Sequence, residues 1–283
     1  DPLWSRGLGD VYKRQLFAAS VLIFLLMRAV PGNPARVALG VNATDEAVEK
    51  LTHSMGLDRP LIVQYAEWMK GLFTGHFGIS LSSQQDITPL VLDRAQVTLL
   101  LIVLAIALAL AGAIPMGLLL ARFRLPVLNA VTQLGIAVPS FLAGILLVAV
   151  FSVHLGWLPA NGWQLPREGL SHLVLPVISL ALVQGAMLTR YVRATLVEEM
   201  DKDYIRTARA MGESRTGALL RHGLRNAALP VLTVTGVQLS TLVVGAVVIE
   251  NVFVLPGLGS MLLSAVSSRD LITVQTLIMV FVT

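Results

Sequence analysis

The stretch Gln96–Ala121, QVTLLLIVLAIALALAGAIPMGLLLA, contains no charged residue and is long enough to cross a membrane as one helix. A bilayer core of about 30 Å requires about 20 mostly apolar residues in helical form. Similar apolar runs occupy residues 127–153, 173–189 and 228–254. These runs predict an all-α protein that is embedded in a membrane.

The composition of the whole chain supports this prediction. Hydrophobic residues make up 55% of the chain and charged residues 13%, and the mean hydropathy is +0.75. A soluble domain carries about 25% charged residues. We therefore expect an integral membrane protein in contact with the lipid bilayer.

Two shorter apolar runs lie near the chain ends, at 16–30 and 272–283. We expect them to belong to the first and last of about six transmembrane helices, each incomplete here. The predicted organisation is a truncated first helix at 16–31, an extracytoplasmic segment at 32–95 and a transmembrane domain at 96–283, truncated at its C-terminus. Residues 1–15, DPLWSRGLGDVYKRQ, are polar and begin without Met, so we expect a non-native segment there.

The distribution of Lys and Arg predicts the orientation, because cytoplasmic loops carry the excess. Arg122 and Arg124 mark one short loop as cytoplasmic, and the segment 190–225 holds eight basic residues. In segment 32–95, by contrast, five basic residues are outnumbered by seven acidic ones. We expect both termini in the cytoplasm, and the pI near 9.8 then reflects topology and no nucleic-acid partner.

Segment 32–95 is expected to contain a small folded subdomain. It holds four aromatic residues, Tyr65, Trp68, Phe73 and Phe77. Thr44 is expected to cap a helix over 44–55 whose first turn holds acidic residues, as the helix dipole favours. The alternative is a plain linker.

The polar segment 203–230, DYIRTARAMGESRTGALLRHGLRNAALP, lies between two apolar runs and within a predicted cytoplasmic loop at 190–226. Gly212 is expected to break its helix. Ala208 and Ala210 would leave room for a docking surface, and Arg206, Arg209 and Arg215 would contact carboxylates of a soluble partner. The alternative is a solvated basic loop that only follows the distribution of positive charge.

The same segment resembles the EAA loop of ABC-transporter permeases, most closely those of the dipeptide, oligopeptide and nickel branch. Gly212 stands at the motif's glycine and Ala208 at its second alanine, while residues 222–225, HGLR, replace Ile-x-Leu-Pro as is usual in this branch. The resemblance implies that the loop couples to an ATPase through Arg206, Thr207, Ala208, Arg209, Ala210, Gly212, His222, Leu224 and Arg225.

Three further stretches resemble the same branch in the same order along the chain. They are FLLMRAVPGNP at 24–34, MGLDRP with Gln64-Tyr65 at 55–65, and ENVFVLPGLG at 250–259 followed by Arg269-Asp270. Asn33 stands where Asp is more common. The resemblance covers nearly all of the chain from Phe24 onward.

This resemblance implies one half of the membrane pathway of an ATP-driven importer of di- and oligopeptides, in a bacterial or archaeal plasma membrane. The expected partners are two ABC ATPase subunits, a second homologous permease and an extracytoplasmic solute-binding protein. No G-x-x-x-x-G-K-[ST] phosphate-binding loop occurs in the chain, so we expect no enzyme activity and no directly bound cofactor, with ATP used by the partner subunits. The alternatives are a nickel-complex importer of the same family and an ion-gradient-driven secondary transporter.

Polar residues in or beside the apolar runs are candidates for a transport path. Gln133, Gln184 and Gln238 could offer transient hydrogen bonds to a peptide, or could join helices to each other. Glu250 borders an apolar run and could form an outer gate or reach water at the end of its helix. The five histidines lack metal-ligand spacing, so we predict neither a metal site nor a catalytic residue.

The apolar runs also contain residues that shape helices. Prolines 115, 139, 176 and 230 lie where they could kink a helix. The small residues Ala105, Ala109, Gly112 and Ala113 are expected to allow close helix packing.

Overall fold

The computed structural model describes residues 3–40, 43–123, 125–163 and 169–283. Within these ranges the regular elements are helices, apart from an isolated bridge between Ile79 and Asp86. This confirms the all-α prediction. Arg124, one of the residues that predict the orientation, lies outside the described residues. The chain forms two compact units, one of residues 1–96 and 260–283 and the other of residues 97–259.

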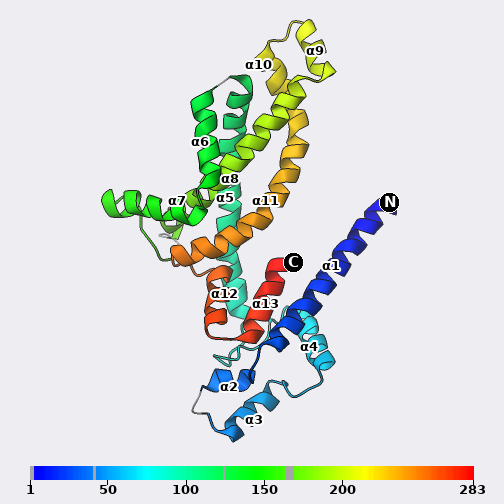
Figure 1. Cartoon of the computed structure of the whole chain (residues 1–283), viewed down its shortest axis with the longest axis vertical. Coiled ribbons are helices and arrows are strands. Elements are labelled where there is room, and N and C mark those ends of the chain that lie inside the picture. Colours follow the sequence, from blue (N-terminus) through cyan, green and yellow to red (C-terminus); the bar gives the residue numbers. More distant parts are fainter. Residues whose placement is uncertain (1–2, 41–42, 124, 164–168) are drawn as a thin grey trace. The chain divides into compact units, whose positions relative to one another are not determined.

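The unit of residues 97–259 is built on long apolar helices. It contains most of α5 (Thr88–Arg122), then α6 (Pro126–Ala137), α7 (Ser140–Leu147), the π-helical η1 (Val148–His154), α8 (Gly169–Met200) and α11 (Leu224–Val252). Helices α8 and α11 pack along each other (Figure 1). The core between them and α5 is mostly aliphatic, and includes Leu101, Leu180, Leu242, Ala246 and Phe253.

Three stretches in the described residues are long and apolar enough to cross a membrane, namely 88–122, 170–200 and 215–252. The run 127–153 was expected to form one more span, but its two halves, α6 and α7 with η1, meet at an angle of 103°. Pro139 lies at this break as the N-cap of α7, where its missing N–H is tolerated. The total of six spans stays a prediction.

The other three prolines behave differently from Pro139. Pro115, Pro176 and Pro230 lie inside helices that continue through them, in α5, α8 and α11 respectively. A proline in these apolar runs therefore does not by itself predict a helix break, because only Pro139 lies at one.

Small residues of α5 allow close helix packing, as expected. Ala105, Ala109 and Ala113 are buried, and a Cβ added at Gly185 of α8 would lie 3.7 Å from the Cα of Ala109. Gly112 differs, because a Cβ there would meet nothing within 4 Å. The expectation of close packing is therefore wrong for Gly112.

The unit of residues 1–96 and 260–283 contains α1 (Leu3–Ala29), α2 (Pro34–Leu39), α3 (Asp45–Ser54), α4 (Leu61–Thr74), most of α12 (Leu258–Ser267) and α13 (Leu271–Val282). Helix α1 packs beside α13 (Figure 1). It is also longer than the expected 16–31, because the helix continues back to Leu3. The non-native origin of residues 1–15 stays a prediction.

Local capping chemistry explains the start of the short helices. The Thr44 Oγ1 accepts a hydrogen bond from the Ala47 N–H at 3.3 Å, with Asp45 and Glu46 in the first turn, which confirms the predicted cap of α3. Asn33 caps α2 in the same way, accepting from the Ala35 N–H at 2.9 Å. A small cluster that includes Val48 and Leu51 then packs α2 against α3.

Aromatic residues attach α4 to the apolar helices of this unit. The Phe24 ring of α1 lies 5.4 Å from the Tyr65 ring and 6.2 Å from the Trp68 ring, centroid to centroid. The Trp68 Nε1–H donates to the Thr276 Oγ1 of α13 at 3.3 Å. Phe73 takes no part, since it is 84% exposed. The segment between α1 and α5 is therefore a folded subdomain rather than a linker.

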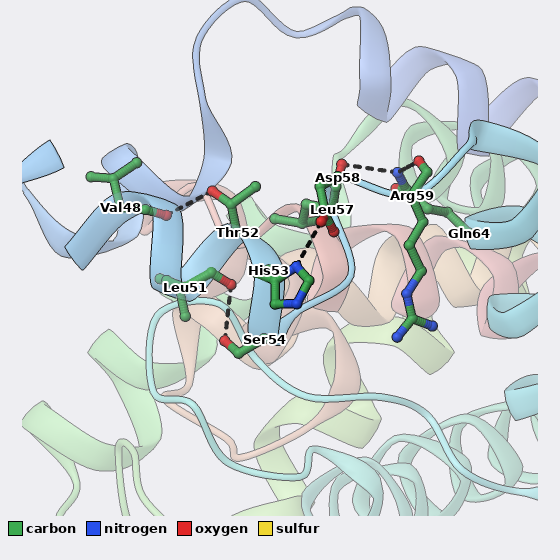
Figure 2. A network of polar contacts seen from close by, with 9 residues as sticks. All are labelled: Val48, Leu51, Thr52, His53, Ser54, Leu57, Asp58, Arg59 and Gln64. Atoms are coloured by element: carbon green, nitrogen blue, oxygen red, sulfur yellow. Dashed lines mark hydrogen bonds and ion pairs between the residues drawn. The ribbon is translucent and has the colours of Figure 1, made fainter. Parts of the chain in front are cut away.

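The turn between α3 and α4 is held by polar contacts (Figure 2). His53 Nδ1 lies 2.7 Å from Asp58 Oδ2, and this hydrogen bond lowers the pKa of the Asp58 carboxyl. The Gln64 amide nitrogen donates to the Leu57 carbonyl at 3.0 Å and to the Arg59 carbonyl at 2.7 Å. The Gln64 side chain of α4 therefore holds the backbone of this turn in place.

A buried carboxylate joins the loop 79–86 to the last helix. Asp270, at 3% exposure, caps α13 and accepts from the Thr273 Oγ1 at 2.8 Å. It also accepts from the Ser80 Oγ at 2.5 Å and from the Leu81 N–H at 3.1 Å. Because these donors come from both segments, the carboxylate binds one to the other.

Asp270→Asn is expected to destabilise this unit. The amide presents a donor where the carboxylate accepts, so part of the Ser80, Leu81 and Thr273 donor set loses its acceptor, at a cost of about 1–3 kcal/mol. Thermal unfolding in detergent measures the effect, with the exposed Asp93→Asn as the matched control. Equal stability of the two variants would contradict the assignment.

Candidate functional site

The polar segment folds into a hairpin of short helices between α8 and α11. It contains α9 (Asp203–Ala210), α10 (Arg215–Ala218) and the π-helical η2 (Leu219–Gly223), at the end of the two long helices (Figure 1). The expected loop 190–226 is shorter in the structure, because α8 continues to Met200 and α11 begins at Leu224.

Gly212 separates α9 from α10. Its φ of +98° lies in the region that favours glycine, which confirms the predicted helix break. Ser214 then starts α10, where its Oγ accepts from the Gly217 N–H at 3.0 Å. The chain can thus reverse direction within a few residues.

Ala208 lies on the inner face of α9. It is 4% exposed and packs with Ile205 and with Ala218 of α10, beside Met200 at the end of α8. The expectation that Ala208 contributes to the docking surface is therefore wrong. Its small size instead lets α10 approach α9, since residues three apart on a helix share a face.

The outer face of α9 carries exposed residues that we call the α9 surface. Arg206 is paired with Asp203 at 3.2 Å, whereas in the described part of the chain Arg209 has no ion-pair partner. Met211, which follows the helix, is 77% exposed. The α9 surface consists of Arg206, Thr207, Arg209, Ala210, Met211 and Gly212.

Met211 was not predicted from the sequence. A single methionine in an arginine-rich segment gives no periodic signal, and its exposure depends on where α9 ends. Large exposed apolar side chains beside unpaired charges are typical of binding surfaces.

The other predicted coupling residues lie on different elements. His222 belongs to η2, where its Nε2 is 3.4 Å from the Glu213 Oε2. Leu224 packs against the core between α8 and α11. Arg225 is exposed at the start of α11. These three residues therefore support the hairpin or lie beside it, and are not part of the α9 surface.

The start of α9 is tied to the end of α8 by hydrogen bonds. The Lys202 ammonium donates to the Glu198 Oε1 at 3.1 Å, which raises the pKa of Lys202. The Tyr204 hydroxyl donates to Glu199, and burial together with this bond raises the pKa of Tyr204. Lys202 thus stays charged and Tyr204 neutral at physiological pH, and both contacts persist.

Two of the predicted pathway residues meet between α8 and α11. The Gln184 Nε2–H donates to the Thr241 Oγ1 at 3.2 Å, and this hydroxyl lies 2.9 Å from the Gln238 Oε1. The Gln238 Nε2 lies 3.0 Å from the Met187 Sδ. This geometry favours the helix-joining role for Gln184 and Gln238. Gln133 is exposed on α6 and is separate from this cluster.

Glu250 is fully buried, so the expectation that it reaches water is wrong. Its Oε1 accepts from the Thr98 Oγ1 at 2.6 Å, and its Oε2 accepts from the Gly259 N–H at 2.8 Å. The Thr98 hydroxyl in turn accepts from the Leu258 N–H at 2.9 Å. The carboxylate thus binds the first residues of α12 to α5 and α11. Its role as a gate stays a prediction.

This arrangement explains the glycines of the sequence Pro256-Gly257-Leu258-Gly259. A Cβ at Gly257 would lie 2.1 Å from the Glu250 Cδ, and one at Gly259 would lie 2.4 Å from the Val247 Cα. Only a residue without Cβ lets the backbone approach the carboxylate this closely.

A cavity of about 520 Å³ lies among α5, α6, α7 and α8, and none of the predicted pathway residues lines it. Its lining is almost wholly apolar and rich in small residues, among them Ala109, Gly135 and Gly185, with Thr132 and Thr189 as the hydroxyl groups. Such a lining offers apolar contact and few hydrogen bonds.

Comparison with known families decides the class of the protein. Residues 109–283 match the family described as binding-protein-dependent transport system inner membrane component, and residues 5–102 match the N-terminal region of such membrane components. The chain belongs to this family. It is therefore a membrane-embedded permease subunit of a transport system, in a family of transport components rather than of enzymes.

Relatives cover almost the whole chain. A protein of Brucella abortus named as a peptide transport system permease is 41% identical over 268 residues, which is 92% of this chain and 85% of the relative. The glutathione transport system permease of Escherichia coli K12 is 38% identical over 275 residues, or 94% of this chain and 87% of the relative. Neither match favours an ion-driven transporter.

Gly257→Ala is expected to destabilise this permease by about 1–3 kcal/mol or more, because the added Cβ overlaps the Glu250 carboxyl group. Gly236→Ala on α11 is the matched control, since a Cβ there meets nothing within 4 Å and alanine favours a helix by about 1 kcal/mol. Thermal unfolding of both variants in the same detergent provides the comparison. A Gly257 variant as stable as the Gly236 variant would refute the close approach.

Proposed function

We propose that this permease forms one half of the translocation pathway of an ATP-driven importer of di- and oligopeptides, and that its α9 surface binds an ATPase subunit. The observation that carries the proposal is the division of α9 into two faces. Ile205 and Ala208 pack within the chain, while Arg209 and Met211 face outward without partners in the described residues.

The α9 surface has the chemistry of a protein-binding site. Arg209 offers guanidinium donors to a carboxylate of the partner, and Met211 offers an adaptable apolar side chain. A central apolar anchor beside charged groups is the usual composition of an interface that carries binding energy.

The position of α9 suits the transfer of motion. The helix is hydrogen-bonded to the end of α8 through Tyr204 and Glu199, and its inner face packs against α10. Both α8 and α11 continue from this hairpin as apolar helices. A displacement of α9 by the ATPase would therefore move both helices, which Gln184, Thr241 and Gln238 join.

The proposed assembly contains two ATPase subunits, a second homologous permease and an extracytoplasmic solute-binding protein. ATP is hydrolysed by the ATPase subunits, because this chain lacks a phosphate-binding loop. The complex lies in a bacterial or archaeal plasma membrane, with α9 and both termini in the cytoplasm and α2–α4 outside. The excess of basic residues in segment 190–225 supports this orientation.

The proposed cargo class is the peptide. The two relatives described above are named for peptide and glutathione transport, and glutathione is itself a small peptide.

Arg209→Glu and Met211→Ser are each expected to reduce ATPase binding by about tenfold or more, through charge reversal and loss of the apolar anchor respectively. The measurement is recovery of ATPase subunits with tagged permease from detergent-solubilised membranes, together with ATP hydrolysis stimulated by loaded binding protein. Lys70→Glu on α4 makes the same charge change in the other unit of the chain and should leave both readouts unchanged. Full recovery and stimulation in both α9 variants would remove the coupling assignment.

The cargo class has its own test in proteoliposomes that contain the complete complex. We expect ATP hydrolysis to rise when the binding protein is given L-alanyl-L-alanine or glutathione, and to stay basal with a nickel–histidine complex. Stimulation by the nickel complex alone would assign the chain to a nickel importer.

A further inference from the structure

A second cavity, of about 280 Å³, lies within the unit of residues 1–96 and 260–283. It is bordered by the end of α1, the turn between α3 and α4, α4 itself and the start of α13. Its polar lining includes Arg28, Gln64, Glu67, Trp68, His76 and Gln275. It is distinct from the α9 surface and from the amides between α8 and α11.

Arg28 contributes to this cavity a guanidinium group with N–H donors that lack a hydrogen-bond acceptor. Its Nε and Nη1 atoms are buried and have no hydrogen-bond partner among the described residues. Its guanidinium carbon lies 5.0 Å from the Phe24 ring centroid, a cation–π contact that gives neither of these two buried nitrogens a hydrogen-bond acceptor. Buried guanidinium donors require an acceptor, and their planar fork matches a carboxylate.

Gln64 brings an unsatisfied acceptor. Its amide nitrogen donates to the Leu57 and Arg59 carbonyls, so two acceptors determine which end of the amide is nitrogen (Figure 2). The Oε1 must then lie on the other side, where it is buried and has no donor in the described part of the chain. Gln64 is only 9% exposed, so its Oε1 requires a donor inside the cavity, from an ordered water or from the N–H group of a ligand.

Glu67 adds a negative charge to the lining. Its Oε1 is paired with the Arg59 Nη1 at 2.5 Å, and its second oxygen remains able to accept. The cavity thus combines a free cation with an amide oxygen and a carboxylate. This combination matches a ligand that carries an anionic group and an N–H or ammonium group.

Cavity size limits the ligand. Pockets for drug-sized ligands begin at about 300 Å³, and this cavity is slightly smaller. A free phosphate would satisfy Arg28 but has no ammonium group for Gln64 and Glu67.

We propose that this cavity binds a small zwitterion, a free amino acid or dipeptide, with its carboxylate on Arg28 and its ammonium or amide N–H on the Gln64 Oε1. The bound ligand would join α1, α4 and α13, which already meet through Phe24, Trp68 and Thr276. The site shares no lining residue with the candidate pathway residues Gln133, Gln184 and Gln238, and the proposal does not rest on the cargo assigned above.

The phosphoethanolamine headgroup of a lipid shares this chemistry, because it carries an anionic oxygen group and an ammonium. The two sources differ in the length of the link between the charges and in the presence of a lipid anchor. The experiment therefore includes glycerophosphoethanolamine as a separate probe.

The test is isothermal titration calorimetry of the full-length permease in detergent with L-alanyl-L-alanine. We expect saturable binding that becomes about tenfold weaker or more with L-alanyl-L-alanine amide, which lacks the carboxylate. Arg28→Met should weaken binding of the acid by a similar factor. Arg36→Met, which alters an exposed arginine of α2 in the same unit, should not.

Three outcomes would overturn the proposal. One is equal affinity for the acid and the amide in the unaltered permease, a comparison that needs no variant to fold. Another is unchanged affinity in both Arg28→Met and Arg28→Lys, the second of which keeps the charge but removes the fork. The third is binding of glycerophosphoethanolamine without binding of the dipeptide, which would assign the cavity to a lipid headgroup.

Discussion

The carboxylate of Glu250 is buried among apolar helices, where an ionised group without partners would be strongly destabilising. Thr98 of α5 and the Gly259 N–H at the start of α12 satisfy its oxygens. The path of the chain from 253 to 259 follows from this requirement. Val254 adopts a φ of +53°, and Gly257 approaches so closely that no side chain fits. The reversal after α11 is therefore shaped around one buried acidic side chain.

Asp270 provides the corresponding contact in the other unit. Helix α13 is short and apolar, and its first turn is held by a carboxylate that also binds Ser80 and Leu81. In both cases an acidic side chain satisfies backbone N–H groups at a helix start, which have no partner within the helix. Each carboxylate acts at the first turn of one helix, so the chain can turn sharply there without a large apolar interface.

The candidate functional residues differ in whether their polar side chains have partners within the chain. Gln184, Thr241 and Gln238 form a chain of hydrogen bonds that joins α8 to α11, although the buried Gln184 Oε1 has no hydrogen-bond partner among the described residues. Arg209 and Arg28 are different, since neither guanidinium has an ion-pair partner in the described residues. Arg209 is exposed, which suits a protein partner, whereas Arg28 is half-buried and lines a cavity that suits a small ligand.

Much of the fold and part of the candidate site could be predicted from the sequence alone. The apolar runs determined an all-α membrane protein, Thr44 determined the start of α3, and Gly212 determined the break after α9. These features depend on each residue and its near neighbours along the chain. The segments around Glu250 and Gly212 also indicate the family from the sequence alone.

Only the tertiary structure decided which way particular residues face. Ala208 turned inward because α10 packs against α9, and Met211 turned outward because α9 ends before it. Glu250 is buried because Thr98, far away in the sequence, supplies a donor, and the cavity at Arg28 exists because α1, α4 and α13 meet. Helical periodicity determines which residues share a face, but contacts between distant segments determine whether that face meets a core, a partner or a ligand.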